Sequence, residues 1–214
     1  MIVIVACLIA AVAVLRSCAV SPLQPNRVTP VAAEVVVEAN GVPDTSQSHD
    51  PSACFKQGSG LWIRVATQEL QVIRDGQVVR TYRCSTAAKG VGNQRDSEKT
   101  PLGWHEIGAK IGDGAPAGAI FEERRYKGHV WQPGERTNAD LVLSRVLRLR
   151  GLQNGYNRGG NVDSWDRCIY IHGTNDLEEL GRPSSHGCIR LSPTDVIELF
   201  NSVPVGCRVL ITEQ

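Results

Sequence analysis

Aromatic residues are scarce in this chain of 214 residues, where Phe, Trp and Tyr together make up 5%. Glycine is plentiful, with 21 residues. A composition poor in aromatic side chains and rich in glycine favours a turn-rich β protein over a helical bundle. The length suffices for one domain with a full core plus a tail, and we expect one domain.

The chain also lacks an excess of charge of either sign. Its 23 Lys and Arg residues face 22 Asp and Glu residues, which leaves a net charge of +1. No basic field of the kind that selects nucleic acid or anionic lipid is therefore expected. The mixture of aromatic and basic side chains from Phe121 to Trp131 is interpreted as a solvated loop or strand edge, and we predict no nucleic-acid partner.

Only the amino-terminal end carries a long apolar run, the fourteen residues from Ile2 to Leu15. This run is short for a membrane span but has the size of the apolar region of a secretory signal. We predict that residues 1–19 are a signal peptide or an N-terminal anchor and that residues 20–58, with scattered Pro, Ser, Asn and Gln, are a flexible linker. The protein is then exported to the periplasm or cell envelope, and only such an anchor would bind it to a membrane.

Short groups of β-forming residues follow. Leu61–Ala66 and Leu70–Ile73 precede an Asp-Gly turn signal at Asp75 and Gly76. Later strands are predicted at Val78–Cys84, His105–Ile107, Leu141–Leu152, Ile169–Ile171 and Cys207–Ile211, and a glycine-rich loop at Gly108–Gly118. The sequence thus predicts a mainly β fold, an antiparallel sandwich- or barrel-like sheet.

One helix is predicted near the C-terminus. Ser192 offers a hydroxyl at the N-cap, proline follows at the first helical position, and Asp195 is an acid at the third. Apolar residues from Val196 to Val203 give the helix one buried face. We expect this helix to support the sheet.

The candidate chemistry lies between Cys168 and Leu191. A free thiol is only a few per cent thiolate at neutral pH, so Cys188 needs a base to act as a nucleophile. His186 lies two residues before it and His172 sixteen, and on extended strands either could reach its face. Glycines flank both groups: Gly173 permits a change of direction, and Gly187 lets the N–H groups of Gly187 and Cys188 face a developing oxyanion.

This stretch resembles a known family signature. His172-Gly173, a gap, and then Ser-His-Gly-Cys-Ile-Arg from Ser185 to Arg190 are similar to the signature of the L,D-transpeptidase catalytic domain (YkuD-like), which builds and remodels peptidoglycan cross-links. Thr100-Pro101-Leu102-Gly103 resembles the family's Thr-Pro-x-Gly element. The resemblance extends over roughly Leu61 to Ile211 and assigns residues 59–214 to the catalytic domain.

The resemblance implies a role for each signature residue. Cys188 is the nucleophile and His172 the general base, while the carbonyl of Gly173 steadies the other ring nitrogen. His186 orients the site without being the main base. Ser185 and Arg190 shape substrate binding, and the planar fork of an arginine suits a carboxylate of the stem peptide.

The implied reaction is acyl transfer between peptidoglycan stem peptides, without a cofactor. Two other functions remain open: an L,D-carboxypeptidase that uses water on the same site, and a non-catalytic envelope-binding protein with Cys188 in a disulfide. A zinc site built from His172, His186 and Cys188 is disfavoured, because the chain has no Cys-x-x-Cys and no fourth ligand at the usual spacing, and we expect no metal.

Four further cysteines follow the predicted signal: Cys54, Cys84, Cys168 and Cys207. They could form two disulfides in any of three pairings, which an oxidising envelope compartment would permit, or they could all be reduced and buried.

Overall fold

The computed structural model describes residues 55, 58–135 and 137–214. The predicted signal or anchor at residues 1–19 lies outside the described residues, as does almost all of the predicted linker. In the described ranges, no helix combines the length and the apolar character needed to cross a bilayer.

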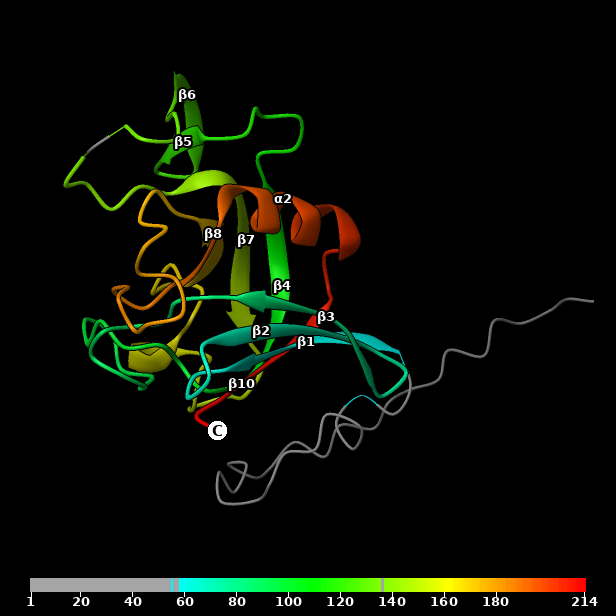
Figure 1. Cartoon of the computed structure of the whole chain (residues 1–214). Coiled ribbons are helices and arrows are strands. Elements are labelled where there is room, and N and C mark those ends of the chain that lie inside the picture. The colour runs from blue at the N-terminus through cyan, green and yellow to red at the C-terminus, as the bar shows by residue number, and fades with distance from the viewer. Residues whose placement is uncertain (1–54, 56–57, 136) are drawn as a thin grey trace, which may run out of the picture. The chain divides into compact units, whose positions relative to one another are not determined.

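In the part of the chain that the structure describes, ten strands form one mixed sheet, and one α-helix accompanies it (Figure 1). The strands are β1 (Ser59–Arg64), β2 (Glu69–Arg74), β3 (Gln77–Arg83), β4 (Gly103–Ile111), β5 (Ala119–Glu122), β6 (Arg125–Val130), β7 (Leu143–Gly151), β8 (Tyr170–Gly173), β9 (Ile189–Leu191) and β10 (Arg208–Thr212). The helix is α2 (Pro193–Ser202), and a short 3-10 turn, η1, spans Gly160–Val162. The predicted mainly β fold with a C-terminal helix is confirmed.

The sheet is not purely antiparallel. Its strand order is β3-β2-β1-β10-β4-β7-β5-β6, and β8 attaches to β7 and carries β9. Seven of the nine strand pairings are antiparallel, whereas β1 with β10 and β8 with β9 are parallel. The first and last described strands therefore lie side by side, and the indole N–H of Trp62 donates to Thr212 Oγ1 at 2.9 Å across this pair.

The Asp-Gly turn joins β2 and β3 as predicted. Asp75 and Gly76 both have left-handed backbones, with φ of 49° and 76°. Two consecutive residues of this kind form the tight turn whose twist matches paired antiparallel strands.

Helix α2 covers one face of the sheet beside β7 and β8 (Figure 1). Its buried residues Val196, Leu199 and Phe200 join the main apolar core. Ile171 of β8 and Ile189 of β9 belong to the same core. The helix thus packs on the apolar face of β8 and β9, and the candidate chemistry lies on their opposite face.

One loop prediction needs correction. Strand β4 continues to Ile111, through part of the predicted loop at Gly108–Gly118, and a bulge between Ile107 and Ala109 absorbs Gly108. A Cβ on Gly108 would lie 2.7 Å from the Trp165 ring, so glycine is what lets the indole pack there.

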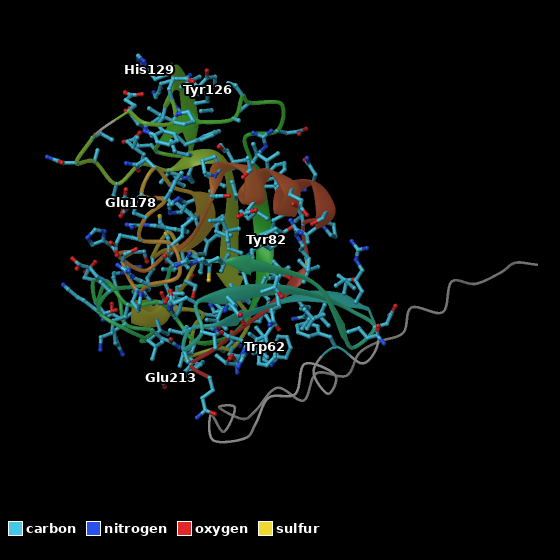
Figure 2. All side chains as sticks on the ribbon, viewed as in Figure 1. Trp62, Tyr82, Tyr126, His129, Glu178 and Glu213 are labelled. Atoms are coloured by element: carbon cyan, nitrogen blue, oxygen red, sulfur yellow. The ribbon has the colours of Figure 1, made fainter. Side chains whose placement is uncertain are left out.

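The aromatic and basic stretch from Phe121 to Trp131 was predicted to be a solvated loop or strand edge. It forms the β5–β6 hairpin, whose turn residues Glu123 and Arg124 have positive φ. Figure 2 shows Tyr126 and His129 projecting from this hairpin. The predicted solvated strand edge is present, as part of a paired hairpin.

The N-cap of α2 generates a stability prediction. Ser192 Oγ accepts a hydrogen bond from the Asp195 N–H at 3.0 Å, which satisfies one of the unpaired donors of the first turn. Ser192→Ala is expected to cost about 1 kcal/mol and to lower the Tm by about 2–4 °C in thermal melts. Ser192→Asp keeps an acceptor and should melt near the wild type, whereas an unchanged Tm in the alanine variant would contradict the capping role.

Candidate active site

The parallel pairing of β8 with β9 sets which side chains share a face. Ile171 lies opposite Ile189 and His172 lies opposite Arg190. Side chains alternate along a strand, so the two isoleucines enter the main core while His172 and Arg190 lie on the other face. Cys188, two residues before Arg190, shares the face of His172. The predicted nucleophile and base are thus on one face of adjacent strands.

Cys188 is a free thiol held against the main chain. Its Sγ accepts a hydrogen bond from the Tyr170 N–H at 3.4 Å and donates to the Cys168 carbonyl at 3.5 Å. Burial raises the pKa of the Cys188 thiol to about 11, although the Tyr170 N–H lowers it. At neutral pH the group is therefore a thiol, and attack requires a base.

His172 is almost fully buried, with 2% of its surface exposed. Its Nδ1 lies 2.8 Å from the Gly173 carbonyl oxygen, which can only accept, so Nδ1 carries the proton and Nε2 keeps its lone pair. Burial lowers the pKa of His172, so the imidazole is neutral at neutral pH. No hydrogen bond joins His172 to Cys188 among the described residues; the thiol is bonded to the main chain instead.

Gly173 has a structural role other than the predicted change of chain direction. It keeps extended backbone as the last residue of β8 and does not form an abrupt turn. A Cβ at this position would lie 2.7 Å from the Leu143 carbonyl oxygen. The close approach follows from a bulge in β7, where Ser144 has a φ of 67° and the register with β8 shifts. Glycine is needed here for contact between backbones.

Ser185 holds the turn that precedes Cys188. Its Oγ donates to the Cys188 carbonyl at 2.6 Å and accepts from the Gly187 N–H at 3.2 Å. Gly187 has a φ of 129°, which favours glycine, and its carbonyl accepts from Thr100 Oγ1 at 3.1 Å. The Gly187 N–H is thus already bonded in this structure, so its oxyanion role and the substrate contact of Ser185 stay predictions.

Arg190 and His186 meet at a carboxylate that the sequence analysis did not single out. Arg190 is 4% exposed, and its Nη2 donates to Asp140 Oδ2. His186 Nδ1 lies 3.3 Å from the same oxygen. Arg190 therefore holds a carboxylate of the protein itself, and its predicted role in substrate binding stays a prediction.

The other cysteines of the described residues are also free thiols. Cys84, Cys168 and Cys207 form no disulfide, and Cys54 lies outside the described residues. Burial raises the pKa of Cys84 to about 12 and that of Cys207 to about 11, which makes both thiols inert. Across the described ranges, no three His, Cys, Asp or Glu side chains are grouped to hold a metal ion.

Comparison with known proteins gives a family match over most of the chain. The family model of the L,D-transpeptidase catalytic domain, YkuD, matches residues 59–211. YqjB of Bacillus subtilis (strain 168), named as an L,D-transpeptidase, is 48% identical over 56 residues, 26% of this chain and 32% of YqjB. ErfK/SrfK of Salmonella typhimurium (strain LT2), with the same family name, is 35% identical over 94 residues, 43% of this chain and 30% of the relative. These matches span about a third of the length of the curated relatives.

Solved structures of L,D-transpeptidases are similar at lower identity. The enzyme from Mycobacterium smegmatis has 20% identity and a TM-score of 0.45, over 72% of this chain and 58% of that chain. LdtMt1 in complex with imipenem has 21% identity and a TM-score of 0.45, over 73% and 59%. The family assignment rests on the family model, whose match reaches from the first residue of β1 into β10 and includes every signature residue of the site. This chain belongs to the L,D-transpeptidase catalytic domain family.

Proposed function

We propose that the protein is a peptidoglycan L,D-transpeptidase that uses Cys188 as its nucleophile and His172 as its general base. One observation carries the proposal: a free thiol and an imidazole with its Nδ1 fixed share one face of the β8–β9 pair. Membership of the family supports the reaction class. The tetrapeptide stem as substrate is inferred from that membership.

The proposed first step forms a thioester. His172 Nε2 takes the Cys188 thiol proton as Sγ attacks the carbonyl carbon that follows the diamino acid of a tetrapeptide stem. The carbon–nitrogen bond to D-alanine breaks, and the imidazolium returns the proton to the departing amine. The Cys188 N–H is the main-chain donor proposed to stabilise the oxyanion during this step.

The proposed second step transfers the acyl group. The amine of a second stem gives a proton to His172 and attacks the thioester carbonyl, and the carbon–sulfur bond breaks to restore the Cys188 thiol. A new peptide bond then joins the two stems. The first step begins from a neutral thiol and a neutral imidazole, since burial disfavours the charged form of each. The second step begins from the thioester and again from a neutral imidazole.

Hydrolysis on the same site is the second candidate. Water in place of the acceptor amine would make the protein an L,D-carboxypeptidase that trims stems. Product analysis with and without an acceptor amine separates the two functions. The non-catalytic envelope-binding alternative presumed a disulfide at Cys188, and the free thiol of the structure argues against it.

We further propose that the protein acts in the periplasm or cell envelope, with a signal or anchor at residues 1–19, a linker at residues 20–58 and the catalytic domain at residues 59–214. The apolar run at the amino-terminal end and the peptidoglycan substrate support this placement. An alkaline phosphatase fusion to residues 1–58 would test export.

Removal of the Cys188 thiol tests the nucleophile. Wild-type protein incubated with tetrapeptide-bearing muropeptides should gain an acyl adduct in intact-protein mass spectrometry, and Cys188→Ala should gain none. Cys168→Ala is the matched control, because this thiol lies near the site but is not the proposed nucleophile, and it should keep the adduct. An adduct that persists in Cys188→Ala would place the nucleophile elsewhere.

The pH dependence of acylation tests the base. A general base acts in its neutral form, and burial lowers the pKa of His172 below its usual value of 6.5. The acidic limb of kcat/KM is therefore expected below pH 6.5, because the imidazole stays neutral until more acidic pH is reached. His172→Gln should lower kcat/KM by roughly 10²- to 10⁴-fold. An acidic limb above pH 6.5, or a His172→Gln variant of nearly full activity, would count against this base.

A further inference from the structure

Asp140 lies outside the family signature yet touches two of its residues. It sits in the loop before β7, and its Oδ2 contacts Arg190 Nη2 and lies 3.3 Å from His186 Nδ1. One carboxylate oxygen of Asp140 thus contacts both His186, two residues before Cys188, and Arg190, two residues after it. Nothing in the family signature refers to this position.

The Asn175 side chain bonds the backbone on both sides of Asp140. Asn175 Oδ1 accepts from the Leu141 N–H at 3.0 Å, and Asn175 Nδ2 donates to the Ala139 carbonyl at 3.1 Å. The main chain on both sides of Asp140 is therefore bonded to a residue only three positions after His172. These bonds do not involve the Asp140 carboxylate, so a substitution of that side chain leaves the loop supported.

The buried guanidinium of Arg190 requires a compensating negative charge beside it. An uncompensated buried charge is strongly unfavourable. Besides Asp140, Nη1 reaches Ser184 Oγ at 3.4 Å and lies 4.0 Å from Asp176 Oδ2. Its Nε has no partner in the part of the chain that the structure describes. Asp140 is thus the closest compensating charge for a guanidinium that has few other partners.

Charged and titratable groups face Cys188 from several elements. Arg190 comes from β9 and Asp140 from the loop before β7. Cys168, Arg167, Tyr170 and His172 come from β8 and the segment that leads into it. Asp140 raises the pKa of the Cys188 thiol and Arg190 lowers it, and the same pair acts with the same signs on His172. The two charges therefore oppose each other at both proposed catalytic groups.

We propose that Asp140 is a positioning residue of the site: its carboxylate fixes the Arg190 guanidinium and the His186 imidazole beside Cys188 and compensates the Arg190 charge there. The inference rests on the proposed function only in taking Cys188 as the nucleophile. Its test uses thiol chemistry alone, without any peptidoglycan substrate.

The experiment measures alkylation of Cys188 by iodoacetamide as a function of pH, with the labelled peptide quantified by mass spectrometry. Asp140→Asn keeps the shape of the side chain and removes its charge, which leaves the Arg190 charge uncompensated near the thiol. Alkylation at pH 8 should become roughly three- to tenfold faster, and its pH profile should move to lower pH. Asp140→Glu restores the charge and should return the profile toward that of the wild type.

Asp176→Asn is the matched control. Asp176 also faces Arg190, but at 4.0 Å, and is similarly accessible, so its amide variant should keep the wild-type profile within about twofold. Asp140→Ser provides a second neutral variant, and thermal melts show whether each protein is folded.

A folded Asp140→Asn or Asp140→Ser protein with the wild-type Cys188 profile would overturn the inference. Loss of folding in both variants would also overturn it, because Asp140 would then serve the stability of the fold. A shifted alkylation profile in the Asp140 variants, together with wild-type protein that gains no acyl adduct from muropeptides, would support the role of Asp140. The same pair of results would refute the transpeptidase. The two proposals therefore fail separately.

Discussion

The parallel pairing of β8 with β9 is the constraint on which the site depends. A slip of one residue would turn Cys188 and Arg190 into the main core and bring Ile189 to the face of His172. The register is held by apolar burial, since Ile171 and Ile189 both enter the core that α2 covers. The hydrophobic face of these two short strands thus decides which side chains meet on the polar face.

Burial also sets the protonation states of the two proposed catalytic residues, Cys188 and His172. It raises the pKa of the Cys188 thiol to about 11 and lowers that of His172, so neither group is charged at rest. Arg190 and Asp140, which form an ion pair, and Arg167 are charged groups near the thiol. Reactivity in such a site comes from proton transfer during the attack, since a stored thiolate would lack solvation.

Local patterns predicted the parts of this protein that depend on neighbouring residues. The turn at Asp75 and the cap at Ser192 both follow from residues a few positions apart. Spacing left His172 and His186 both open as the partner of Cys188, and the family resemblance selected His172. The parallel contact of the first and last strands brings together residues about 150 positions apart, and no local pattern contains it. Asp140 was missed for the same reason, because its partner lies 50 residues further along the chain.

A bifunctional alkylating reagent would measure directly whether the thiol and the imidazole are neighbours. Native protein treated with 1,3-dibromoacetone, which can bridge a thiol and an imidazole through three carbons, would be digested and searched for cross-linked peptides by mass spectrometry. The β8–β9 register predicts a cross-link between Cys188 and His172 that disappears in urea. Labelling of Cys188 with no link to His172, or a link to His105 in its place, would contradict the arrangement of the site.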